Sequence, residues 1–408
     1  MLQLAKPKHR FLYLDSLRAI SAIYVVMHHA VLQYYLVEPT NLSKAETFLL
    51  KFFSDGHLAV DMFIVLSGFS LMLAVTKNKY QLKGGIALFF KRRIIRIVPP
   101  YYASLLVSFL LATLFISQKT GTIWDFSIPI TNNDIISHLL FVHDFFLSTS
   151  PKISYSLWSI SVECRLYLFF PLMVLLWRKK GAWSAFLFSV ITTVIFSITL
   201  VVLKGYNTDI NLLRSGVSPF IILFTLGMVA ADISFSYSNI ASNIRRIYNN
   251  LNATIVVIFF IAAFIIYKML PSLIMHSSLP AQNKELLTEE TKDIIFGIIA
   301  ALFLFVCAAA SKSTKDTWLS GLLNWRPLAF AGTFSYSLYL IHPALLQILS
   351  QYILNSASLS IFVKACLLLT LGTPLIMLMS YLFFLVFERP FMISSKKYKS
   401  VDSEVITA

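Results

Sequence analysis

The chain alternates between long apolar stretches and short polar connections. Ten stretches of about twenty residues can be read along it, and about twenty apolar residues in a helix span the hydrocarbon core of a bilayer. We therefore predict an all-α polytopic membrane protein, with about ten transmembrane helices that form a single domain over residues 1–408. The predicted spans are 14–36, 57–76, 97–117, 157–177, 184–204, 216–235, 253–270, 294–310, 331–354 and 362–387.

Composition agrees with this class and excludes a soluble globular protein, because 57% of the residues are hydrophobic and only 13% are charged. A net charge of +15 can indicate nucleic-acid binding, but here the basic residues gather in alternate connections. Of the 34 Lys and Arg residues, 22 lie before span 1 or after an even-numbered span, and 10 lie in or beside the opposite connections. The positive-inside rule then places both termini in the cytoplasm and explains most of the charge without a nucleic-acid partner.

Two ionisable residues share one face of the first span. Arg18 and His29 are eleven residues apart, so their side chains point in nearly the same direction, roughly 16 Å apart along the helix axis. Ionisable side chains are costly in lipid and usually face a protein interior or a wet cavity. We interpret the pair as part of a polar cavity within the bundle. The three cysteines are widely spaced within spans, so we expect neither disulfides nor a metal site.

Two acidic residues in later spans are candidate partners for His29. The directions of the spans place Asp61 near the outer end of span 2, and Glu163 about two turns inside the outer surface. An imidazole beside carboxylates suits general-base catalysis on a hydroxyl group. We therefore name His29, Asp61 and Glu163 as candidate catalytic residues, and an interhelical polar clamp without chemistry as the alternative.

Two further polar groups allow a functional and a structural interpretation. Arg93 and Arg96 share a face just before span 3, on the predicted cytoplasmic side, and their guanidinium groups suit either ligand phosphates or lipid headgroups. Tyr336, Tyr339 and His342 form a polar stripe in span 9, which either lines a substrate cavity or hydrogen-bonds a neighbouring helix. The outer connection 118–156 either contacts a sugar or is an ordinary interfacial loop. Its apolar segment 134–147 is too short to cross the membrane.

In this order and at these spacings, the segments resemble acyltransferase family 3. Members are integral-membrane enzymes that O-acylate sugars, often in bacterial cell-surface polysaccharides. The resemblance spans nearly the whole chain, and the set is far more specific than any single segment. The matching pieces are residues 14–20 with an Arg-x10-His spacing that ends at His29, then 60–69, 93–99, 156–163, 336–343 and 387–390.

The resemblance implies an acyl-CoA donor, usually acetyl-CoA, that is used from the cytoplasmic side. It also implies that His29 is the catalytic histidine and Glu163 a functional acid. The implied donor-binding arginines are Arg18, Arg93 and Arg96.

One departure concerns the acid, because members often carry two consecutive acidic residues where this chain has Glu163 followed by Cys164. Many members also carry an extra C-terminal hydrolase-like domain, which we expect this chain to lack.

From these features we expect an acetyl-CoA-dependent O-acetyltransferase in a bacterial cell membrane. Its expected partners are membrane lipid, acyl-CoA and a glycan or sugar acceptor. A transporter or flippase for a glycan or lipid-linked sugar is the alternative, because intramembrane charges also line translocation paths. The sequence leaves open the acceptor hydroxyl, the acyl chain, the formation of an acyl-enzyme and the oligomeric state.

Overall fold

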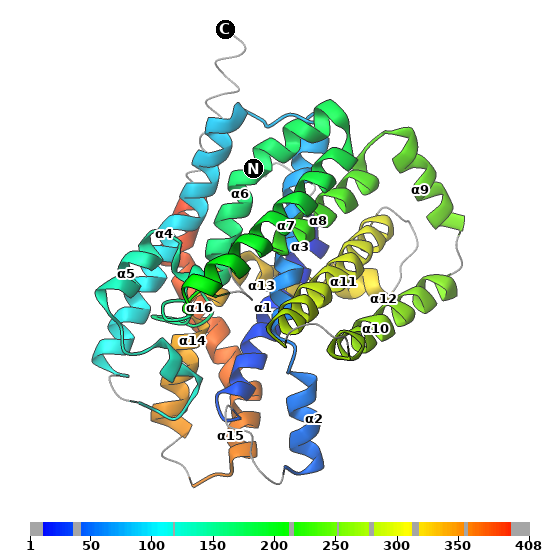
Figure 1. Ribbon diagram of the computed structural model, residues 1–408. Coiled ribbons are helices and arrows are strands. Elements are labelled where there is room, and N and C mark those ends of the chain that lie inside the picture. The colour runs from blue at the N-terminus through cyan, green and yellow to red at the C-terminus, as the bar shows by residue number, and fades with distance from the viewer. Residues whose placement is uncertain are drawn as a thin grey trace, which may run out of the picture.

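The computed structural model of the protein describes residues 11–35, 42–116, 119–211, 216–250, 253–276, 281–311, 318–354 and 358–392. Across these ranges the secondary structure is helical, apart from one isolated antiparallel bridge between Phe146 and Ile210. The predicted all-α class is therefore confirmed. Figure 1 shows the helices as a bundle, with the connection that contains α5 packed against one side of it.

The helices follow the predicted spans closely. The long ones are α1 (Leu12–Leu32), α3 (His57–Thr76), α4 (Gly85–Leu114), α6 (Trp158–Lys180), α7 (Ala182–Tyr206), α8 (Phe220–Phe235), α10 (Ala253–Met275) and α11 (Ala281–Ala310). Shorter helices are α2 (Lys44–Phe52), α5 (Asn132–Leu139), α9 (Asn239–Asn250), α12 (Trp318–Leu323), α13 (Arg326–Ala331), α14 (Ser335–Ile348), α15 (Ile361–Leu367) and α16 (Thr373–Phe383). Segments of 3₁₀- or π-helix are η1 (Ile123–Ser127), η2 (His143–Phe145), η3 (Gly332–Phe334), η4 (Leu349–Leu354), η5 (Leu368–Gly372) and η6 (Phe384–Glu388).

Seven helical stretches of the described chain are long and apolar enough to cross a membrane, and an eighth forms if α8 and α9, bent by 84°, count as one. These eight correspond to eight of the ten predicted spans. The other two predicted spans also form helices, α1 and α14, but α1 is not apolar enough and α14 is not long enough to be counted with the eight. α1 carries Asp15, Arg18, His28 and His29, which lower its hydropathy, and α14 has only 14 residues.

Two helices, α4 and α11, begin about twelve residues before the predicted spans, and α11 begins at Ala281 rather than at residue 294. Span 3 was predicted to begin at residue 97, but α4 begins at Gly85, directly after Gly84 with its left-handed φ of 77°. The stretch from Ile86 to Ile95 lacks helix breakers, so the helix forms there before the apolar run starts. Arg93 and Arg96 therefore lie inside a rigid helix rather than in a connection.

The helices α3 and α8 pack with their backbones in direct contact. A Cβ atom added at Gly68 of α3 would lie 2.0 Å from the carbonyl oxygen of Phe224, and one added at Gly227 of α8 would lie 2.0 Å from that of Val65. Small residues allow this close approach between membrane helices. The two glycines thus fix the position of α3, which forms one wall of the site described below.

We expect Gly68→Ala to destabilise the protein by roughly 1–3 kcal/mol, because the new methyl group meets backbone rather than a side chain that can move. Thermal unfolding of the purified protein in detergent should show a lower midpoint. Gly205→Ala on α7 is the matched control, because an added Cβ there meets nothing within 4 Å. Equal midpoints for the two variants would contradict the close packing of α3 and α8.

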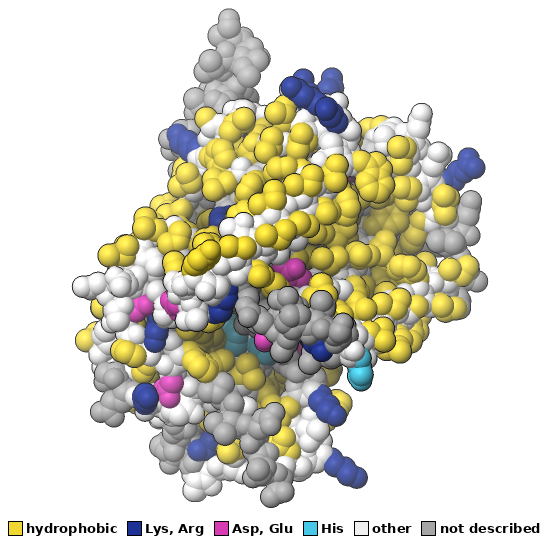
Figure 2. Space-filling view, viewed as in Figure 1, with side chains coloured by type: hydrophobic (Ala, Val, Ile, Leu, Met, Phe, Trp, Pro, Cys, Tyr) yellow, Lys and Arg dark blue, Asp and Glu magenta, His cyan; other side chains and the backbone are white. Residues whose placement is uncertain are grey.

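The outer surface of the bundle suits a lipid environment. Large apolar side chains are exposed along α7 and α10, among them Ile195, Ile198, Ile261 and Ile265. Figure 2 shows hydrophobic side chains covering much of the midsection, with a group of Lys and Arg side chains at the upper edge. The connection between α3 and α4 and the last turn of α6 supply basic residues at this end, which we call the basic end of the bundle.

The connection from 115 to 157 folds against the opposite end. Its segment 134–147 forms only the eight-residue α5 and the short η2, in agreement with the prediction that it does not cross the membrane. Arg165 of α6 holds the connection with a bidentate pair of hydrogen bonds to Asp144. The buried rings of His138 and His143 stack with centroids 3.7 Å apart. Burial lowers the pKa of His138 to about 4, so two neutral rings stack here at neutral pH.

Candidate active site

A cavity of about 250 Å³ lies among α1, α3, α4, α6 and α14, and it collects most of the predicted site residues. Three arginines line it, Arg18, Arg93 and Arg96, together with the carboxylate of Glu163. The predicted polar cavity within the bundle is therefore present. The remaining lining residues are Val60, Phe63, Ile64, Ser67, Ser70, Leu71, Ala74, Ile97, Ser159, Ile160, Tyr167, Ser335, Tyr336 and Tyr339.

Each arginine is held differently. The guanidinium of Arg18 donates to Ser70 Oγ at 2.6 Å and to Asp15 Oδ1 at 3.2 Å. The guanidinium of Arg93 lies against the ring of Tyr167, 5.7 Å from its centroid. Arg96 is exposed. Three cations and one carboxylate leave the cavity wall with a net positive charge, which suits an anionic ligand such as a phosphate.

Glu163 lies on the wall of this cavity and hydrogen-bonds neighbouring hydroxyl groups. It accepts hydrogen bonds from Ser67 Oγ at 3.1 Å and from the hydroxyl of Tyr167, and these two hydroxyls lie 2.8 Å apart. The sequence analysis named neither Ser67 nor Tyr167 as a partner of Glu163. The available signal for Ser67 was its spacing from Ser70, because the two serines lie one turn apart on α3.

His29 has a hydrogen-bond partner that the sequence analysis did not predict. Its Nδ1 lies 2.9 Å from Nε2 of His342 on α14, and the two rings stack with centroids 5.1 Å apart. The ring of Tyr155 covers the pair, with its centroid 4.9 Å from that of His29. The predicted meeting of His29 with Asp61 and Glu163 stays a prediction, because the described contacts of these two acids are with other residues. The spans set the height of each residue along the bundle, but packing selects which helix faces it.

The surroundings of His342 fix the direction of this hydrogen bond. Its Nδ1 lies 2.8 Å from the carbonyl oxygen of Tyr339 and 3.2 Å from that of Leu338. A carbonyl oxygen only accepts, so Nδ1 of His342 carries a hydrogen and, in the neutral ring, Nε2 accepts. His29 then donates from Nδ1 and keeps the lone pair of its own Nε2. This is the tautomer that a general base requires.

The stripe on α14 connects the cavity with the histidine pair. Tyr336 lines the cavity and donates its hydroxyl to the carbonyl of Ile97 at 3.1 Å. Tyr339 also lines it, and its ring centroid lies 5.8 Å from that of His342. Its hydroxyl donates to the carbonyl of Ser156 at 2.7 Å. Tyr339 therefore contacts both the arginine-lined cavity and His342, the partner of His29.

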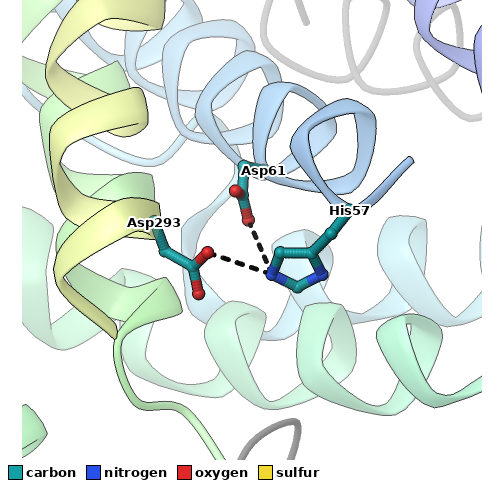
Figure 3. Close-up of side chains that lie close together, drawn as sticks. All are labelled: His57, Asp61 and Asp293. Carbon is teal, nitrogen blue, oxygen red and sulfur yellow. Dashed lines mark ion pairs between the residues drawn. The ribbon is translucent and has the colours of Figure 1, made fainter. Parts of the chain in front are cut away.

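Asp61 belongs to a different cluster. It lies one turn from His57 on α3, and their side chains approach to 3.6 Å. Asp293 of α11 approaches the same imidazole nitrogen at 3.1 Å (Figure 3). Arg165 and Glu163 also face different ways, as their two-residue spacing implies, because Arg165 pairs with Asp144 in the outer connection.

Comparison with known proteins identifies the family of the chain. A family model described as an acyltransferase domain matches residues 11–388. The chain belongs to acyltransferase family 3. The match includes every element that lines the cavity and also the histidine pair, so the family assignment and the site concern the same part of the chain. No solved structure matches the chain significantly.

The family includes curated relatives from several bacteria. A Staphylococcus aureus protein named "Putative O-acetyltransferase" is 24% identical over 357 residues, which cover 83% of this chain and 51% of the relative. The Bacillus subtilis "Putative peptidoglycan O-acetyltransferase YrhL" is 26% identical over 82% of this chain and 48% of its own length. The Listeria monocytogenes "Peptidoglycan O-acetyltransferase OatA" is 22% identical over 81% and 48%. The chain thus spans about half the length of these relatives.

Proposed function

We propose that this protein is a membrane-bound O-acetyltransferase that transfers an acetyl group from acetyl-CoA to a sugar hydroxyl of an exported glycan. Family membership supports acyl transfer, and the names of the curated relatives support acetyl as the acyl group. The observation that carries the proposal is the cationic cavity, whose lining residue Tyr339 contacts the hydrogen-bonded pair of His342 and His29.

The donor is proposed to enter from the basic end, which faces the cytoplasm by the positive-inside rule. Acetyl-CoA is a polyanion, and its phosphates suit Arg93 and Arg96 on α4, with Arg18 deeper on α1. Arg18 and His29 lie roughly 16 Å apart along α1. A long, thin thioester arm is the kind of group that can span this distance while its charged end stays with the arginines.

The acceptor is proposed to approach His29 from the opposite end of the bundle. His29 Nε2 removes the proton of the sugar hydroxyl, and the oxygen attacks the carbonyl carbon of the thioester. The carbon–sulfur bond then breaks, and the leaving CoA sulfur takes the proton back from the imidazolium of His29. The hydrogen bond to His342 holds the ring in place throughout and stabilises its charged form.

The acceptor class follows from the relatives and from the location of the site. Two of the relatives are named as peptidoglycan O-acetyltransferases, which favours a glycan outside the cytoplasm.

The decisive experiment is reconstitution of the purified protein in liposomes with acetyl-labelled acetyl-CoA and candidate glycans. Transfer of label to glycan hydroxyls is the expected result. Movement of a glycan or lipid-linked sugar across the bilayer without acetyl-CoA, and without label transfer, would instead indicate a transporter or flippase. Mass analysis of surface glycans from a deletion strain would then identify the acceptor by its loss of acetyl groups.

We expect His342→Phe to lower the rate of acetyl transfer by about 10- to 100-fold, because Phe fills the space but cannot hold the tautomer of His29. His342→Gln, whose side-chain oxygen can accept the same hydrogen bond, should recover part of the loss. The pH dependence of kcat separates this role from mere packing, since a changed pKa of the base moves the profile. Equal rates and profiles for both variants and the wild type would remove His342 from the mechanism.

A further inference from the structure

A second polar cluster lies beside the cavity and has no part in the proposed reaction. His57 and Asp61 lie one helical turn apart on α3, and Asp293 reaches them from α11. Figure 3 shows both carboxylates directed at the same edge of the imidazole ring. Each residue offers one ligand atom, and these atoms all lie within 4.8 Å of one another. The three side chains thus form a compact set of one nitrogen and two oxygen ligands.

Burial makes the charge of this set costly. The side chain of Asp61 is fully buried, that of Asp293 is 3% exposed and that of His57 is 18% exposed. Two ionised carboxylates and a neutral imidazole carry two negative charges, and even a protonated imidazole leaves one. Ionised side chains are expensive to bury in a poorly solvated interior. A divalent cation bound by both carboxylates and the neutral imidazole would make the set neutral.

The geometry also suits a metal ion. His57 Nε2 lies 3.1 Å from Asp293 Oδ1 and 3.6 Å from Asp61 Oδ1. Ligands at 2.0–2.1 Å around a tetrahedral ion are separated by roughly 3.3–3.4 Å, between these two distances. Two ligands at i and i+4 on one helix, completed by a residue from another element, are a recurring arrangement in helical metal sites.

Aromatic side chains enclose the imidazole. Trp158 of α6 stacks on His57 with centroids 5.7 Å apart and ring planes 18° apart, and Phe220 of α8 lies 6.1 Å from it. Such a shell limits access of water and strengthens the electrostatic attraction between a cation and its ligands. Trp158 precedes Ser159, which lines the cavity. An ion held here would therefore connect α3 and α11 next to the cavity wall.

We propose that His57, Asp61 and Asp293 bind one divalent transition-metal ion. The mixed nitrogen and oxygen set suits Zn²⁺ or Mn²⁺ better than Ca²⁺ or Mg²⁺, which prefer oxygen ligands alone. The ion holds α3 against α11 and takes no part in acyl transfer. This proposal differs from the sequence-based expectation that the chain has no metal site. Its test does not depend on the transferase proposal.

The test uses the full chain purified in detergent with a histidine-free affinity tag. The protein is stripped with a chelator, equilibrated with buffered Zn²⁺ or Mn²⁺ and analysed for bound metal by mass spectrometry. One equivalent of Zn²⁺ or Mn²⁺ per chain and a raised thermal midpoint are expected. Loss of a ligand in Asp293→Asn should weaken binding by at least about 100-fold. Asp232→Asn is the matched control, because this half-buried carboxylate on α8 accepts a hydrogen bond from Tyr80.

Two results would overturn the proposal. One is the absence of saturable binding of either ion to the wild-type chain, a measurement that does not depend on how any variant folds. The other is equal metal content in Asp293→Asn and the wild type. Acetyl transfer is measured separately, so a chain that transfers acetyl but binds neither ion would refute the ion site and leave the transferase proposal unaffected.

Discussion

Replacing His29 with alanine should lower the rate of acetyl transfer by about 100- to 10,000-fold, the usual contribution of a general base. The loss should appear in kcat, because the arginines that are proposed to hold the donor are unchanged. Membrane insertion and the thermal midpoint should stay close to those of the wild type, since His29 is only partly buried. Rates with labelled acetyl-CoA in liposomes give both kcat and KM.

His28→Ala is the matched control for this experiment. His28 is the neighbouring residue, but its Nδ1 lies 2.5 Å from the carbonyl of Phe53, at the end of α2, so it contacts a different part of the fold. We expect its loss to change kcat much less than the loss of His29. Retention of transfer by His29→Ala, or an equal loss in both variants, would show that the base is another group.

Removing both Arg93 and Arg96 should weaken the use of acetyl-CoA by roughly 100-fold or more in kcat/KM. Each hydrogen bond to a charged group contributes about 1.5–3 kcal/mol, and two such groups are lost. The effect should fall mainly on the KM for acetyl-CoA, because the arginines are proposed to hold the donor phosphates at a distance from the reacting carbonyl. Kinetics at varied acetyl-CoA and fixed glycan separate KM from kcat.

Arg92→Ala removes one positive charge from the same turn of α4, and it is also the matched control for each single variant, Arg93→Ala and Arg96→Ala. Arg92 is absent from the cavity lining, and its guanidinium donates to the carbonyl of Lys83 at 3.3 Å. We expect this variant to use acetyl-CoA almost as the wild type does. An unchanged KM in the double variant, or an equal rise of KM in Arg92→Ala, would indicate that these arginines orient the chain in the membrane and bind lipid headgroups rather than the donor.

The sequence predicted the helices well where an apolar run ends at charged or turn-forming residues. Span 2 was predicted at 57–76 and α3 is His57–Thr76, and span 4 was predicted at 157–177 and α6 is Trp158–Lys180. The start of α4 was misplaced because its first turns are amphipathic rather than apolar, so hydropathy alone placed the boundary too late. Hydropathy locates the membrane core, whereas helix propensity decides where a helix begins.

The sequence indicated which residues line the cavity but did not indicate the contact between His29 and His342. Arg18, Arg93, Glu163 and Tyr336 all line it, because residues at similar heights on adjacent helices of a bundle tend to meet. The pairing of His29 with His342 depends instead on which faces of α1 and α14 are in contact. A single sequence gives the period of each helix but not its rotation against a neighbour, so it did not point to His342 as a partner of His29.

The close contact of α3 and α8 also limits how the protein can admit its donor. Two helices whose glycines touch the opposite backbone cannot slide or rotate without a steric clash, so α3 is a fixed wall that carries Ser67 and Ser70. The proposed passage of an acyl group from the cavity toward His29 would therefore require movement of α1, α4, α6 or α14, which line the rest of the cavity, rather than of α3.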